Sequence, residues 1–182
     1  MTGPRVGIGH NGGPDMAGRG WRAHCWRQAR ADLLPHLPIE VVRTRVRRAQ
    51  ALGLDYKTYA GVRATTGRDI VAFLFSSNAL RVLPGRAVPQ TVAQRLDGLA
   101  ADRIGLALAP LAPEVLMTLP LHEAHAAPRP FAPWPEMRAA LDAARGHRPG
   151  GACVLVTEAP FEMDWLVAGR LGACLPSSAI FG

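Results

Sequence analysis

Residues 69–83 read D-I-V-A-F-L-F-S-S-N-A-L-R-V-L and contain the most concentrated apolar block of the chain, at 70–75. Such a block must be buried, so we expect it to form the centre of the core. Turn-forming residues lie on both sides of it, which favours a strand buried on both faces, as in a parallel sheet. A helix that begins at Asp69 and runs to Leu83 is the alternative, because few residues of the stretch are β-branched.

Helix and strand patterns alternate along the rest of the chain. The connections between successive strands exceed about ten residues, which predicts right-handed parallel pairing. We therefore expect an α/β fold: a basic N-terminal helical segment followed by a small, mostly parallel sheet of three or four strands flanked by helices. Besides the central strand, we expect strands at 104–109, 152–156 and near 179–181, and helices at 21–34, 39–52, 56–64, 88–99, 134–146 and 163–171.

Composition divides the chain into three parts. Residues 1–20 are rich in glycine and are predicted to form a flexible arm. Residues 21–67 form a basic helical segment, and residues 68–182 an α/β domain. Within the last part, residues 110–135 are rich in proline and show little periodicity, so we expect a long irregular excursion over the surface.

Positive charge is concentrated in the first part of the chain, which has a formal net charge of +7. Residues 1–70 hold 12 of the 21 Lys and Arg but 5 of the 14 Asp and Glu, whereas residues 71–182 hold 9 of each kind. Such a positive field is typical of proteins that bind a phosphate backbone or an acidic partner. Only Lys57 among the basic residues of the first part is a lysine, so a coding preference for arginine explains the excess equally well.

The predicted helix at 39–52 has the clearest periodicity in the chain. Val42 and Val46 lie on one apolar face, which we expect to pack against the core, and Gly53 is expected to end the helix in a left-handed conformation. A third helix follows, with Asp55 as its predicted cap. The other arc of the 39–52 helix carries Arg43, Arg45, Arg47 and Arg48, the predicted contacts of a nucleic acid or an acidic protein.

The glycine-rich start of the chain contains G-I-G-H-N-G-G-P at residues 7–14. This segment resembles the beginnings of an uncharacterised family of otherwise dissimilar alphaproteobacterial proteins. The resemblance covers eight residues and implies no activity. The loop has no GK[ST] ending and no strand before it, so it does not predict a P-loop.

A second candidate site lies where the strands of the predicted sheet end. Ligands of parallel sheets bind beyond the carboxyl ends of the strands, which we expect at Ser76, Ser77 and Asn78 and at Glu158. The Ser-Ser-Asn turn is able to hold an anion with its hydroxyl and N–H groups, or to cap a following helix without any ligand. Glu158 has no visible partner for acid–base chemistry.

Metal sites, disulfides and cofactors are not expected. Cys25, Cys153 and Cys174 are few and far apart, which predicts reduced thiols. The H-E-A-H sequence at 122–125 misses the zincin spacing by one residue and lacks a third ligand, so we interpret it as a solvated polar loop. The sequence shows no signal peptide and no membrane-spanning run, which predicts a cytoplasmic protein.

Two hypotheses of different class follow. In the first, the chain is a non-enzymatic binding or accessory protein whose Arg-rich helical face contacts nucleic acid or an acidic protein. In the second, it is a small α/β enzyme or ligand-binding module with a polar crevice at the carboxyl ends of the strands. The sequence does not decide whether the protein is an enzyme.

Overall fold

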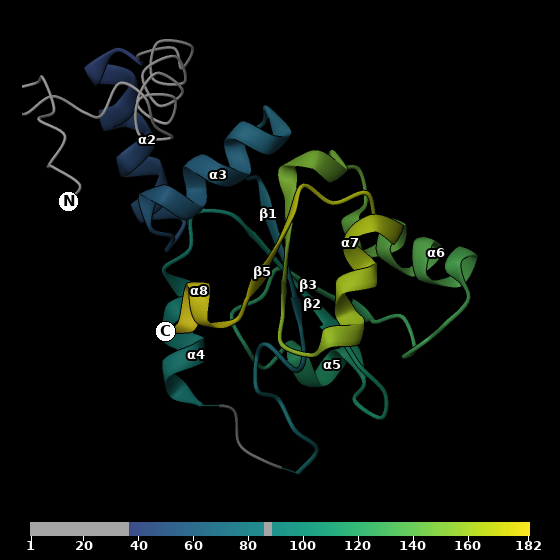
Figure 1. Ribbon diagram of the computed structural model, residues 1–182. Helices are drawn as coiled ribbons and strands as arrows, with labels where there is room; N and C mark the ends of the chain where they lie inside the picture. Colours follow the sequence, from purple (N-terminus) through teal and green to yellow (C-terminus); the bar gives the residue numbers. More distant parts are fainter. Residues whose placement is uncertain (1–36, 86–88) are drawn as a thin grey trace, which may run out of the picture. The chain divides into compact units, whose positions relative to one another are not determined.

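A computed structural model describes residues 37–85 and 89–182 (Figure 1). The predicted arm at 1–20, the predicted helix at 21–34 and Cys25 lie outside these residues. Contacts divide the chain into one unit up to Val41 and a second unit from Val42 to Gly182, and the second unit contains the whole sheet.

The described residues form a five-stranded sheet in which all neighbouring strands are parallel, in the order β3-β2-β1-β4-β5. The central strand β1 pairs with β2 on one side and with β4 on the other, and all five of its residues are buried. The predicted central strand and the α/β fold class are thereby confirmed, and the helical alternative for 69–83 is wrong. The strands are β1 (Ala72–Ser76), β2 (Asp102–Ala107), β3 (Glu123–Ala126), β4 (Cys153–Thr157) and β5 (Ala173–Pro176).

Helices cover both faces of the sheet. Phe73 and Phe75 point from β1 into one core cluster, together with residues of α2, α3, α4 and α8, whereas Ala72 and Leu74 point into a second cluster with α6 and α7. Figure 1 shows α4 and α8 side by side, away from α6 and α7. The helices are α2 (Ile39–Ala51), α3 (Tyr56–Thr66), α4 (Gln90–Asp97), α5 (Pro113–Leu116), α6 (Trp134–Arg145), α7 (Asp164–Ala168) and α8 (Ser178–Phe181), with short 3₁₀ helices η1 (Gly150–Ala152) and η2 (Pro160–Met163).

Local sequence signals set the ends of α2 and α3. Gly53 follows α2 with φ 67°, the left-handed conformation that the sequence predicts. Asp55 begins α3 by accepting a hydrogen bond from the N–H of Thr58 at 3.0 Å, which confirms the predicted cap. Both helices contribute to the core beside β1, because Ala49 of α2 and Tyr59 of α3 are buried in the same cluster as Phe73. The segment from residue 42 to residue 67 therefore shares its core with the sheet.

Three expectations about the second half of the chain need correction. The sheet has five strands, where the sequence predicts three or four. The stretch at 110–135 is not wholly irregular, because it contains α5 and β3. The terminal segment near 179–181 is helical, and the last strand is β5. Both missed strands are short edge strands with partly exposed side chains, so they lack the apolar run that marks a buried strand.

One general property follows from the helix lengths. Within residues 37–85 and 89–182, no helix combines the length and the apolar character that crossing a bilayer requires.

Two glycines provide a matched test of this packing. A Cβ at Gly172 would lie 2.5 Å from the carbonyl oxygen of Gly151, whereas a Cβ at Gly61 in α3 would meet nothing within 4 Å. We expect Gly172→Ala to lower the free energy of unfolding by about 2 kcal/mol or more, because the added methyl group would force the backbone at Gly151 or Gly172 to move. Gly61→Ala should raise it by about 0.5–1 kcal/mol through helix propensity. Urea unfolding of both variants measures the difference, and equal effects would contradict the close approach at Gly172.

Candidate functional site

The strand order places a topological switch point at the carboxyl ends of β1 and β4. From β1 the chain continues to β2 and β3 on one side, and it then returns to β4 and β5 on the other side. Open sheets of this kind bind ligands in the crevice where the two directions diverge. Three of the predicted residues, Ser76, Asn78 and Glu158, follow or end these two strands and meet around one further residue, Glu162.

Glu162 in η2 is a fully buried carboxylate that ties the two strand ends together. Its Oε2 accepts hydrogen bonds from the hydroxyl of Ser76 at 2.9 Å and from the backbone N–H groups of Glu158 at 3.0 Å and Ala159 at 3.1 Å. Its Oε1 accepts a hydrogen bond from the Asn78 side chain at 2.9 Å. Four donors compensate the desolvation of the buried carboxylate, so Glu162 fixes the geometry of this edge.

The sequence analysis did not single out Glu162, although a local signal was present. Pro160 stands at the start of η2 and Glu162 two residues later, a pattern typical of a helix N-terminus whose acidic side chain reaches back to backbone N–H groups. The two long-range donors, Ser76 and Asn78, had no such signal.

Most of the predicted polar triplet is used inside the fold. Ser76 is fully buried; besides donating to Glu162, its hydroxyl accepts the N–H of Ala79 at 3.1 Å. Ser77 is buried as well, and its hydroxyl accepts the N–H of Leu108 at 3.2 Å. Asn78 is partly exposed. These contacts assign Ser76 and Ser77 to the support of the strand ends rather than to direct ligand contact.

Next to this support lies a cavity of about 250 Å³ between the carboxyl ends of β4 and β5. Thr157 at the end of β4 and Glu158 just after it border the cavity, together with Met163 from η2 and Cys174 from β5. Glu158 is exposed, and its Oε2 accepts a hydrogen bond from the hydroxyl of Ser177, so it spans the two strand ends. The full lining is Thr157, Glu158, Ala159, Pro160, Met163, Cys174, Leu175 and Pro176.

The polar groups inside the cavity are mostly uncharged. The Thr157 hydroxyl lies 3.2 Å from the sulfur of Cys174, and this sulfur lies 3.5 Å from that of Met163. Burial raises the pKa of the Cys174 thiol, which outweighs the lowering effect of the hydrogen bond with Thr157. The thiol is therefore protonated at neutral pH, and it is a poor nucleophile.

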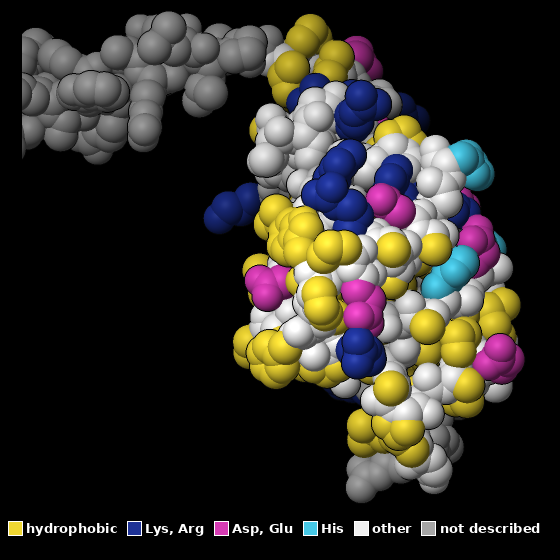
Figure 2. All heavy atoms as spheres, turned by 90° about the vertical axis from the view of Figure 1, so that its right-hand side faces the viewer, with side chains coloured by type: hydrophobic (Ala, Val, Ile, Leu, Met, Phe, Trp, Pro, Cys, Tyr) yellow, Lys and Arg dark blue, Asp and Glu magenta, His cyan; other side chains and the backbone are white. Residues whose placement is uncertain are grey.

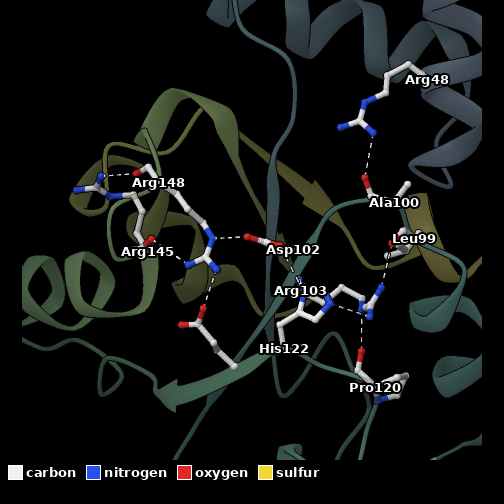
Figure 3. A network of polar contacts seen from close by, with 10 residues as sticks. Arg48, Leu99, Ala100, Asp102, Arg103, Pro120, His122, Arg145 and Arg148 are labelled. Carbon is white, nitrogen blue, oxygen red and sulfur yellow. Dashed lines mark hydrogen bonds and ion pairs between the residues drawn. The ribbon is translucent and has the colours of Figure 1, made fainter.

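The amino edge of the sheet carries a contrasting network of charges (Figure 3). Arg148 is nearly buried and donates to Asp102 at the start of β2, at 2.7 Å, and to Glu123 at the start of β3, at 2.6 Å. The hydrogen bond from Arg148 is the main reason that the pKa of Glu123 is lowered, with a further contribution from His125. Through these contacts, Arg148 ties the segment after α6 to β2 and β3. They also explain why an acidic residue, Glu123, stands at the start of the edge strand β3.

The H-E-A-H sequence lies at the start of β3 and not in a solvated loop. His122 lies beside Arg103, whose backbone N–H donates to its Nδ1 at 3.1 Å, whereas His125 lies 3.2 Å from the Glu123 carboxylate. Successive residues of a strand point to opposite faces, and His122 and His125 are three positions apart, so the two histidines cannot chelate one ion. No cluster of three or more His, Cys, Asp and Glu side chains suited to a metal occurs in the part of the chain that the structure describes.

The arginines of α2 have different environments. Arg48 donates to the Asp69 carboxylate at 2.9 Å, and also to the carbonyl oxygens of Ile70 at 2.8 Å and Ala100 at 2.9 Å. It therefore holds α2 against the amino ends of β1 and β2. Arg43 and Arg47 are exposed and Arg45 is partly exposed. Figure 2 shows one face of the molecule, on which Lys and Arg side chains gather toward the end where α3 lies.

Asp69 connects this arginine to α3. Burial raises the pKa of Asp69, but hydrogen bonds from Tyr59 and Arg48 and the positive charge of Arg48 outweigh it, and the pKa is lowered overall. Burial is the largest cause of the raised pKa of Tyr59, whose hydroxyl donates to Asp69 at 2.8 Å. Arg48 is thus one member of a structural network.

Comparisons of the chain with models of protein families, with curated proteins and with solved structures found no match.

The ion pairs at the amino edge predict a pH dependence of stability. The pKa of Glu123 is lower in the folded chain than its ordinary value, so Glu123 stabilises the fold above about pH 4.5, and this contribution is lost as the pH falls through the folded pKa. Arg148→Met should lower the free energy of unfolding at pH 7 by about 1–3 kcal/mol, because two carboxylates lose their partner. It should also make stability fall less steeply below about pH 4.5.

Urea unfolding at pH 7, 5, 4 and 3 measures both effects. Arg129→Met is the control, because Arg129 pairs with Glu136 at an exposed position and should change the stability much less. An unchanged pH dependence in Arg148→Met would contradict the assigned role of the Arg148–Glu123 pair.

Proposed function

We propose that the protein is a ligand-binding module that holds a small, largely apolar molecule in the cavity between the carboxyl ends of β4 and β5. One observation carries the proposal: an open cavity of about 250 Å³ lies at the edge where doubly wound sheets bind their ligands. The switch point at β1 and β4 is adjacent. Glu162 holds the wall of the cavity in place from behind, through the backbone of Glu158 and Ala159.

The lining favours binding over acid–base or nucleophilic chemistry. Most of its surface comes from apolar side chains, with single polar groups at Thr157 and Glu158. The thiol of Cys174 has a raised pKa, so it does not supply a thiolate. His122 and His125 belong to the segment of β3, which β2 and β1 separate from β4 and β5, so neither can act as a general base for this cavity.

The experiment that tests this proposal uses the side chain of Met163, which lines the cavity and is half exposed. The full-length protein is labelled with ¹³C at its methionine methyl groups, and the Met163 signal is assigned with Met163→Leu. Cyclohexanol, cyclohexylamine and cyclohexanecarboxylate are then titrated. We expect at least one probe to shift the Met163 methyl signal in a saturable manner, because the cavity has room for a six-carbon ring.

Ala159→Leu should weaken that binding at least about tenfold, because the larger side chain occupies the cavity. Ala143→Leu is the matched control, since Ala143 is exposed on α6 and does not line the cavity; it should leave binding unchanged. If no probe moves the Met163 signal, or if Ala159→Leu binds as tightly as the wild type, the proposal is wrong.

A second candidate function is nucleic-acid binding by the arginine face of α2. The observation that favours it is that, among the described residues, the side chains of Arg45 and Arg47 make no hydrogen bond or ion pair. Arg48 is not part of this proposal, because its guanidinium is already bound by Asp69 and two carbonyl groups.

The salt dependence of binding measures this second function. If the face contacts duplex DNA or RNA, the double variant Arg45→Ala/Arg47→Ala should flatten the slope of log affinity against log salt by roughly two, since each phosphate contact contributes about 0.9. Stability should change by less than about 0.5 kcal/mol per exposed site. Arg95→Ala is the control, because Arg95 is exposed on α4. Absence of salt-sensitive binding to either nucleic acid would reject the proposal; an acidic protein would then be the remaining partner for this face.

A further inference from the structure

The cavity between β4 and β5 carries one charged group at its rim, and this group indicates the chemistry of the ligand. We propose that the ligand is a cationic amine with an apolar body, whose nitrogen is bound by the carboxylate of Glu158. The inference rests on the proposed function, because it names the class of molecule that the same cavity takes.

The carboxylate of Glu158 is positioned, yet it retains binding capacity. Its Oε2 accepts the hydroxyl of Ser177, a side chain that is buried at the end of β5. Within the described part of the chain, its Oε1 has no hydrogen-bond partner. One oxygen is therefore held by the protein and the other is open to a donor. An ammonium group is the donor that gains most from a carboxylate, because charge-assisted hydrogen bonds are stronger than neutral ones.

The other residues that line the cavity disfavour an anionic ligand. Among the described residues that line the cavity, Glu158 is the only charged one, and no lysine or arginine is present. A phosphate or carboxylate ligand would lie beside Glu158 without a positive partner, which costs desolvation and repulsion. The excess positive charge of the chain lies in residues 1–70, and residues 71–182 hold equal numbers of acidic and basic side chains. Residues 71–182 as a whole therefore carry no excess positive charge that would offset the negative charge of Glu158.

The remaining lining fits the apolar body of such an amine. Pro160, Met163, Leu175 and Pro176 present carbon and sulfur surface, and Met163 is an adaptable side chain that suits variable shapes. The Thr157 hydroxyl is already within hydrogen-bond distance of Cys174, so it adds little polarity. The site thus combines one anionic contact with an apolar wall, as in small-molecule pockets where a few polar groups fix the orientation of a ligand and apolar side chains bind its body.

The test compares three probes of one shape: cyclohexylamine, which is cationic at pH 7, cyclohexanol, which is neutral, and cyclohexanecarboxylate, which is anionic. Each is titrated into the full-length protein while the Met163 methyl signal is followed. We expect the amine to bind about tenfold more tightly than the alcohol, because an ionised donor roughly doubles the strength of the hydrogen bond to the carboxylate. The carboxylate should bind more weakly than the alcohol.

Glu158→Gln should remove the preference for the amine and leave alcohol binding within about twofold, because glutamine keeps the shape and can still accept from Ser177. Asp164→Asn is the matched control: Asp164 is exposed at the start of α7 and does not line the cavity, so the preference should persist. Equal binding of amine and alcohol, or a preference that survives in Glu158→Gln, would overturn this inference while the binding function stands. If none of the probes moves the Met163 signal, the binding function fails, and the inference fails with it.

Discussion

The complete burial of β1 is the constraint on which the rest of the structure depends. Its side chains fill the cores on both faces, and β2 and β4 occupy both of its edges. The first polar group at its end, the hydroxyl of Ser76, is therefore far from water and needs a partner in the protein. Glu162 supplies it, and a buried carboxylate in turn needs several donors, which the backbone after β4 provides. The geometry of the candidate site thus follows from the need to give the buried Ser76 hydroxyl at the end of β1 a hydrogen-bond partner.

Charged side chains have different roles at the amino and carboxyl ends of the strands. At the amino edge, Arg148 and Arg48 each bind several acceptors and hold helices or connections against the strands. At the carboxyl edge, the side chain of Glu162 is held by hydrogen bonds from uncharged donors, and Glu158 keeps an oxygen available. Charges that are satisfied by the fold stabilise it, whereas a charge with spare capacity beside an open cavity is available for binding. This difference favours the carboxyl edge as the functional one.

The sequence predicted those features of the fold that depend on neighbouring residues, and it missed those that depend on contacts between residues far apart in the chain. The strand β1 and the cap at Asp55 were predicted because an apolar run and a capping residue are read from neighbouring positions. The strand β3, E-A-H-A, was missed because its first residue is stabilised by Arg148, which lies 25 positions away. The role of Glu162 was missed for the same reason, since its side-chain donors lie 84 and 86 positions away. Arg48 looked like a surface arginine because its acceptors belong to other elements.

The order of strands in the sheet also governs how the chain must fold during its synthesis. Ala72 pairs with Cys153, so one edge of the most apolar strand stays open until most of the chain has left the ribosome. Parallel pairing between such distant segments is slow, because the long loop must be closed before any contact compensates for it. An unpaired apolar strand is a template for intermolecular association during that interval. The open edge of β1 is therefore the part of the sheet that is most exposed to aggregation while the chain is being made.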